Sequence, residues 1–162
     1  MEQKKRRRRI KQGDVYCIDL GDSVYGYCIA LLSPIAGFYD LRTTNLEQDL
    51  DFITSHPILF KVPIMKYSYK SDDWHYIGNV ELNNDLRKTV YFFKQDPINQ
   101  SISICYVDAD KYTEIPATYE DVKDLERAAV WEPEHVEERL RDHFNGVPNI
   151  SVEIFRPKPI VS

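Results

Sequence analysis

Several common kinds of functional site have no counterpart in this sequence of 162 residues. Its six glycines are scattered singly, so no glycine-rich loop is present to hold a phosphate, and no close cysteine pair or His-Glu-x-x-His motif indicates zinc. The three cysteines are an odd number and lie inside apolar runs, which is typical of buried thiols in a reducing compartment and not of a disulfide framework. We therefore expect a cytoplasmic protein without a cofactor.

Long apolar runs are also missing. The longest uncharged stretch, residues 23–39, is interrupted by Ser33-Pro34 and is shorter than the roughly 20 residues that a membrane-spanning helix needs. The basic run from Lys4 to Arg9 leads into a polar segment and not into the apolar core of a secretion signal. These features predict neither a membrane span nor a secretion signal.

Charge is distributed unevenly along the chain. The net charge is −5, but residues 1–9 carry six basic side chains against one acidic, which leaves 15 basic against 25 acidic in the remainder. Because phosphate contacts require lysine and arginine, the acidic body is unsuited to binding nucleic acid and is suited to a basic protein partner. The alternative is that the acidic residues serve only solubility. We expect residues 1–9 to form a disordered basic arm, with attachment to nucleic acid through Lys4 to Arg9 as the less favoured alternative.

Short apolar runs separated by turn residues predict antiparallel strands. Gly21-Asp22 and Ser33-Pro34 separate three such runs, as expected of two successive hairpins. The second run is apolar on both faces, which predicts a central strand, and Gly26 within it indicates a bulge or a close approach. Pro63 cannot donate a backbone hydrogen bond and so predicts an edge strand or a bulge. The predicted strands are 13–20, 23–32, 35–41, 58–65, 74–78, 89–93, 102–107 and 112–115.

Helical spacing appears in the last third of the chain. Thr118, with Asp121 three residues later, forms a capping-box pattern at the start of a first helix. Pro133 suits the first position of a second helix. The predicted elements are helices over 118–129 and 133–144, the second with a buried stripe of Val136, Leu140 and Phe144, and a last strand over 149–155.

Strands that precede helices, and do not alternate with them, predict an α+β fold. We expect one bent antiparallel sheet, such as an SH3-like open barrel, followed by two acidic C-terminal helices. The length suits a single domain, which we place at residues 10–155. Residues 156–162 contain Pro157 and Pro159 and are expected to form an extended tail.

The cluster that most resembles a catalytic site combines Asp72, Asp73 and His75. These are metal-ligand types, but a hydrolytic site usually needs three or more converging ligands and an open position. A polar turn that leads into a strand anchored by Trp74 is the favoured interpretation. A small metal-dependent hydrolase is the alternative function, with this cluster as its site.

Five short motifs follow one another between residues 10 and 95: Gly13-Asp14, Tyr25-Gly26-Tyr27, Gly37-Phe38-Tyr39-Asp40, Leu59-Phe60-Lys61-Val62 and Trp74-His75-Tyr76-Ile77-Gly78. In this order they resemble the immunity protein 26 family of bacterial polymorphic toxin systems. The resemblance implies fold markers and no catalytic positions. The marker residues are Gly13, Asp14, Gly26, Phe38, Tyr39, Asp40, Trp74 and Gly78.

The same resemblance implies an immunity protein, not an enzyme, that neutralises a cognate toxin domain by stoichiometric binding. Acidic immunity proteins often cover the basic active site of a nuclease toxin, so a basic nuclease is one implied partner. The rival enzyme is a phosphotriesterase-like hydrolase, a label that similar sequences sometimes carry. Residues 118–144, which span the two predicted helices, hold nine acidic against four basic side chains, a charge that would steer a basic partner. We predict as toxin-binding residues Glu120, Asp121, Asp124, Glu134, Glu137, Glu138 and Asp142.

Overall fold

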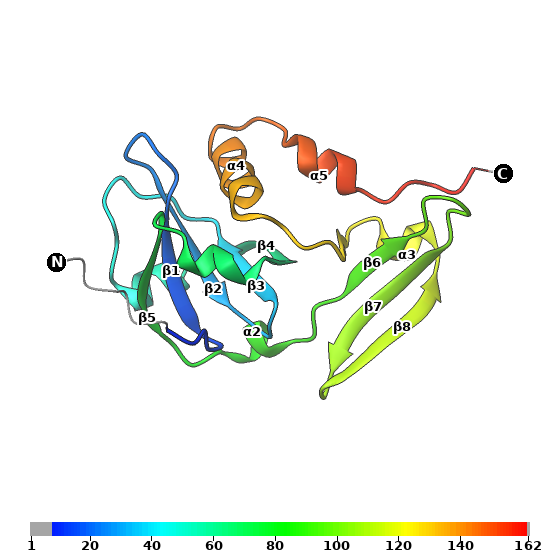
Figure 1. The fold of residues 1–162 in the computed structure, drawn as a ribbon, viewed down its shortest axis with the longest axis horizontal. Coiled ribbons are helices and arrows are strands. Elements are labelled where there is room, and N and C mark those ends of the chain that lie inside the picture. Colours follow the sequence, from blue (N-terminus) through cyan, green and yellow to red (C-terminus); the bar gives the residue numbers. More distant parts are fainter. Residues whose placement is uncertain (1–7, 162) are drawn as a thin grey trace.

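Two β-sheets lie side by side in the computed structural model, which describes residues 8–161 (Figure 1). The first sheet has the order β4-β3-β2-β1-β5 and the second has the order β8-β7-β6-β9. Residues 1–7, most of the predicted basic arm, lie outside the described residues. The strands are β1 (Asp14–Asp19), β2 (Tyr25–Ala30), β3 (Ile35–Tyr39), β4 (Ile58–Pro63), β5 (Trp74–Asn79), β6 (Phe92–Gln95), β7 (Ile102–Asp108), β8 (Lys111–Ala117) and β9 (Glu126–Arg127).

The helices are short and pack against the sheets, α1 and α4 against the first and α3 against the second. Together with the strands they confirm the predicted α+β class, and the described strands do not close into a barrel. Within residues 8–161 no helix combines the length and the apolar character needed to cross a membrane. The helices are α1 (Leu50–Thr54), the 3-10 helix η1 (Lys66–Lys70), α2 (Asn84–Arg87), α3 (Tyr119–Val122), α4 (Pro133–Phe144) and α5 (Ile150–Phe155).

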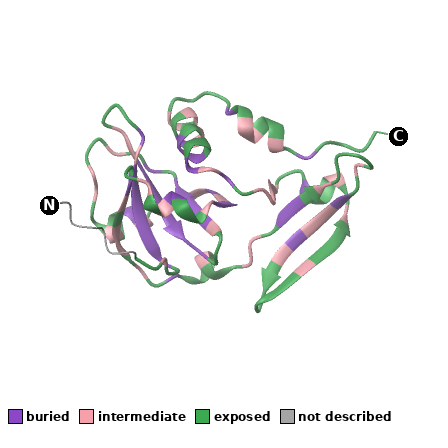
Figure 2. Cartoon of the chain, viewed as in Figure 1, coloured by how far each residue is buried: buried purple, intermediate pink, exposed green. Residues whose placement is uncertain are grey.

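The first sheet is buried on both faces because its strands alternate two sets of apolar residues. On one face Val15 and Cys17 of β1 pack with Ile53 of α1. On the other face Ile18 of β1 packs with Leu140 of α4. Figure 2 shows this sheet as the most continuous buried region of the molecule.

Sequence features of the first sheet are matched by its topology. The two predicted hairpins join β1 to β2 and β2 to β3, and β2 is the central strand. Pro63 lies at the end of β4, an edge strand as predicted. Gly26 pairs regularly with Ile18 and carries no bulge, so the close approach is the correct one of its two interpretations.

The strands after residue 90 form a sheet of their own, and the prediction of one bent sheet is wrong in this respect. Phe93 and Ile102 of this sheet bury their side chains with Val122 of α3. Because these residues form a separate small core, their strands need no place in the first sheet. Alternation along each strand predicted the strands but contained no information about which sheet each one joins.

The predicted helix over 118–129 is mostly wrong. Thr118 and Asp121 form the expected capping box, but α3 ends at Val122. Glu126 and Arg127 then extend to pair in parallel with β6. Helical spacing of apolar residues was present, and pairing with a strand that is distant in sequence overrode it.

The predicted last strand over 149–155 is also wrong, since this segment is helix α5. Asn149 caps the helix by accepting a hydrogen bond from the backbone N–H of Val152 at 3.0 Å. Phe155 at its end packs edge-on against Trp131, with ring centroids 5.3 Å apart. A short apolar run allows either structure, and here the cap and this aromatic contact favour the helix.

Two glycines with nearly the same φ angle, one before β1 and one after it, provide a test of the close approach between Gly13 and Val80. Gly13 has φ +88° and Gly21 has φ +86°, but only at Gly13 would a Cβ meet a neighbour, the Val80 carbonyl oxygen at 2.0 Å. We expect Gly21→Ala to lower the free energy of unfolding by about 1 kcal/mol and Gly13→Ala by about 3 kcal/mol or more. Urea unfolding of both variants measures the difference, and equal losses would contradict the close approach.

Candidate partner-binding surface

Helix α4 packs on the first sheet at Gly26 of β2, a position that has no side chain. A Cβ on Gly26 of β2 would lie 3.3 Å from Cδ1 of Leu140 and 3.3 Å from Cδ1 of Leu20. Val136 and Leu140 are fully buried and Pro133 begins the helix, as the sequence predicts. Gly26 is therefore the position that allows α4 to pack closely.

Two polar contacts from family-motif residues fix the rest of α4. The indole N–H of Trp74 donates to Oε2 of Glu137 at 3.3 Å. Near the other end of the helix, Nε2 of His143 lies 3.0 Å from Oδ1 of Asp40. Trp74 belongs to β5 and Asp40 follows β3, and these two strands lie on opposite sides of the central strand β2. Helix α4 is therefore held at two points across the sheet.

Glu137 does not face solvent, although we predicted it as a toxin-binding residue. It is 9% exposed and accepts the Trp74 hydrogen bond described above. Arg141, one helical turn further on, donates to the carbonyl of Leu20 at 3.3 Å. Burial raises the pKa of the Glu137 carboxyl, and the charges of Asp73 and Glu134 raise it further, while the Trp74 hydrogen bond and Arg141 lower it.

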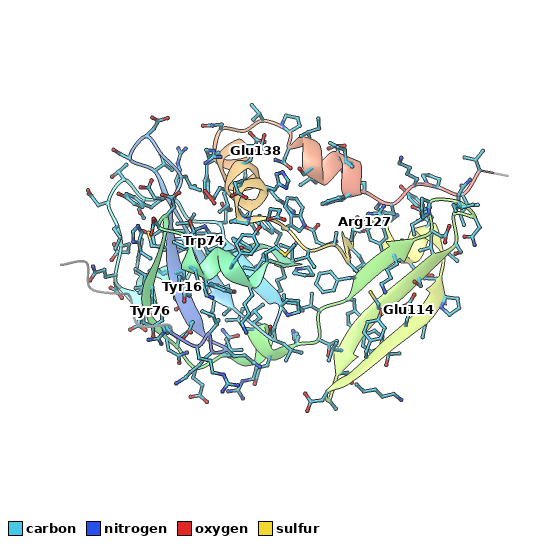
Figure 3. The ribbon with its side chains drawn as sticks, viewed as in Figure 1. Tyr16, Trp74, Tyr76, Glu114, Arg127 and Glu138 are labelled. Atoms are coloured by element: carbon cyan, nitrogen blue, oxygen red, sulfur yellow. The ribbon has the colours of Figure 1, made fainter. Side chains whose placement is uncertain are left out.

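Acidic side chains lie on the outer side of α4, where Figure 3 labels Glu138. Glu134 and Glu138 are exposed one helical turn apart, and Asp73 is close enough for its charge to act on Glu137. Among the ion pairs of residues 8–161, none involves these acids. We call the exposed members of this group the α4 acidic surface: Asp73, Glu134 and Glu138.

The other predicted toxin-binding residues lie elsewhere. Figure 1 shows α3 beside the second sheet, away from α4. There Asp121 is occupied by the capping box and Glu120 pairs with Lys123 at 2.9 Å, while Asp124 is exposed. Asp142, on α4, accepts from Asn149 at 2.9 Å. The predicted toxin-binding residues therefore form two separate patches, one near α3 and one on α4. Strand β9 lies between these two helices in the chain and belongs to the second sheet.

Asp72, Asp73 and His75 do not converge. Asp72 and Asp73 are exposed in the loop before β5, and Asp73 lies toward α4. Successive residues of a strand point to opposite faces, so His75 faces away from Trp74 and Glu137. Nowhere in the described part of the chain do three His, Cys, Asp or Glu side chains form a group that could hold a metal ion.

The remaining motif residues are parts of the fold. Asp14 is fully buried and accepts from Nδ2 of Asn79 at 2.9 Å. Phe38 stacks on Phe60 with ring centroids 4.8 Å apart. Gly13 and Gly78 lie where a Cβ would meet Val80 and Leu50, and Tyr39 is a core residue.

Two features were not anticipated from the sequence. Arg8, within the predicted arm, stacks on the ring of Tyr76 at 3.5 Å and pairs with Asp14 at 3.5 Å. A cleft of about 570 Å³ also lies between the sheets, with Leu32 and Phe92 among its lining residues. Neither had a local signal, because each joins segments that are far apart in sequence.

The buried carboxyl predicts a pH effect. The pKa of the Glu137 carboxyl is raised above the ordinary 4.5 in the folded protein, so the folded state binds the carboxyl proton more tightly than the unfolded state does. The protein therefore loses stability as the pH rises from 4.5 through the pKa of the folded state. We expect Glu137→Gln, which keeps an acceptor for Trp74, to raise the thermal midpoint at pH 7 and to match the unsubstituted protein at pH 4. Glu138→Gln is the exposed control. A lower midpoint for Glu137→Gln at pH 7 would show that the ionised form is the stabilising one.

Comparison with known proteins identifies a family. The family model described as Immunity protein 26 matches residues 11–103, which is more than half of the chain. No curated protein and no solved structure matches. The matched segment contains the whole first sheet and ends within β7, so α4 lies outside it while Gly26, Asp40 and Trp74, which hold α4, lie inside. The chain belongs to the immunity protein 26 family.

Proposed function

We propose that this protein is a cytoplasmic immunity protein that binds a cognate toxin domain stoichiometrically and neutralises it, using the α4 acidic surface as its main contact. The observation that carries the proposal is the unpaired charge of that surface in a family of immunity proteins. Inhibition by binding needs no catalytic group and no cofactor.

The α4 acidic surface is suited to recognition because its scaffold is rigid. Leu140 is buried against Gly26, and Trp74 and Asp40 hold polar groups of the helix. Side chains on such a helix keep their spacing when the partner arrives, so little ordering is needed on binding. Unpaired acids on it also attract a basic partner over several ångströms and accelerate association.

The expected partner is a toxin domain with a basic face. A nuclease is the class that fits best, because an enzyme that binds a polyanionic substrate requires lysine and arginine around its active site. Covering that face would exclude the substrate. The acids near α3 form a second, smaller patch and are assigned no primary contact, since Glu120 and Asp121 already have partners in their own chain.

A charge-removal experiment tests the proposal. The candidate toxin to be tested is the C-terminal domain of the protein encoded by the neighbouring open reading frame, expressed in a host cell with or without this protein. We expect Glu134→Gln combined with Glu138→Gln to slow association at least about tenfold at low salt and to reduce growth rescue. The matched control removes two charges from the other side of the first sheet, by Asp51→Asn with Glu81→Gln, and should leave rescue unchanged.

Three outcomes separate the alternatives. Rescue that is lost only in the α4 variant supports the acidic surface. Rescue that survives in both variants keeps immunity but removes α4 as the contact. A toxic domain that the unsubstituted protein neither binds nor neutralises contradicts the proposed function.

A further inference from the structure

Strand β8 forms an open edge of the second sheet. It pairs with β7 along seven consecutive positions from Lys111 to Ala117, and within residues 8–161 no strand pairs with its other side. Figure 1 shows it as the outermost strand, on the side of the molecule away from the first sheet. An unpaired edge exposes backbone groups that can bind another strand.

The turn before β8 determines which backbone groups point outward. Ala109 and Asp110 have φ of 47° and 63°, which is the conformation of a two-residue hairpin of the I′ type. The pair that flanks such a turn is hydrogen-bonded, and pairs then alternate along the strands. By this alternation the backbone nitrogen of Pro116 points away from β7, which suits proline because it has no N–H to donate. The residues whose backbone groups face outward are therefore Tyr112, Glu114 and Pro116.

The middle of this edge lacks the usual protection. Tyr112 is 53% and Ile115 is 45% exposed, and Figure 2 shows β8 as largely exposed. The charge of Glu114 is compensated within the chain, because Lys94 lies 3.3 Å away and Tyr112 and Ser103 donate to it at 2.8 Å each. An uncompensated charge or a bulge, which normally prevents edge pairing, is absent from residues 112–115.

We infer that two copies of this protein associate through β8, in antiparallel register about a two-fold axis at Thr113, to form one continuous sheet of eight strands. In this register Tyr112 lies opposite Glu114 of the second copy, and each such pair exchanges two backbone hydrogen bonds. Thr113 faces Thr113 of the second copy at a position without hydrogen bonds, a favourable cross-strand pair. Every outward N–H of the edge then has an acceptor.

The competing register is weaker for two reasons. A two-fold axis at Glu114 would place two glutamates directly opposite each other. It would also place Tyr112 opposite Pro116 of the second copy, where the missing proline N–H leaves a carbonyl without a donor. The sequence of β8 therefore favours the Thr113 register over the Glu114 register. The α4 acidic surface stays open in such a dimer, because α4 lies over the first sheet, away from β8 (Figure 1).

Cysteine crosslinking tests the register directly. The three native cysteines are buried, so an introduced thiol on β8 is the accessible one. Directly opposite residues at a position without hydrogen bonds lie within disulfide distance. We expect Thr113→Cys to give a crosslinked dimer under mild oxidation at a yield at least tenfold above Glu114→Cys. A higher yield from Glu114→Cys, or none from either variant, overturns the inference.

Sedimentation velocity tests whether the backbone edge is the contact. We expect the unsubstituted protein to dimerise with rising concentration, and Tyr112→Pro, which removes an outward N–H, to weaken the dimer at least tenfold. Tyr112→Ala is the matched control, because it removes the same side chain and keeps the N–H. Equal weakening by the two variants contradicts strand pairing. A monomer at all concentrations whose Tyr112→Pro variant no longer neutralises the toxin would assign the edge to the toxin and overturn the dimer.

Discussion

The burial of α4 against the first sheet is the contact on which most of this structure depends. Val136 and Leu140 are fully buried there, which contributes roughly 3 to 6 kcal/mol, a large share of the net stability of a typical domain. The same helix reaches the second sheet, because Arg139 pairs with Glu126 of β9 and lies 3.6 Å over the ring of Phe60. The segment between β9 and α4 also connects the sheets, because Trp131 forms a parallel bridge with Ile64 just after β4.

Acidic side chains of this protein differ in whether they form an ion pair within the chain. Some acids away from α4, among them Glu114 and Glu120, form ion pairs with a lysine of the same chain. On α4 the acids stay unpaired within the described residues, and one of them, Glu137, is held partly desolvated by Trp74. Retaining such charge lowers stability, which is reasonable where a partner of opposite charge covers it.

Local chemistry explains which parts of the fold could be predicted. The turns after β1 and β2, the capping box at Thr118 and the helix start at Pro133 depend on neighbouring residues only, and each was predicted correctly. The helix expected over 118–129 failed, because pairing of Glu126 and Arg127 with β6 overrode helical spacing. The acidic character of the candidate surface was visible in the sequence, but the burial of Glu137 was not.

The sequence by itself determined the element types of the first sheet, its hairpins and its family, since periodicity, turn residues and short motifs act over a few positions. Only the tertiary structure decided that the strands divide into two sheets and that Gly26 receives α4. It also decided that the predicted acids separate into two patches and that β8 has an open edge. These features depend on contacts between residues far apart in the chain, and the pattern along one segment contains no information about which distant segment it will meet.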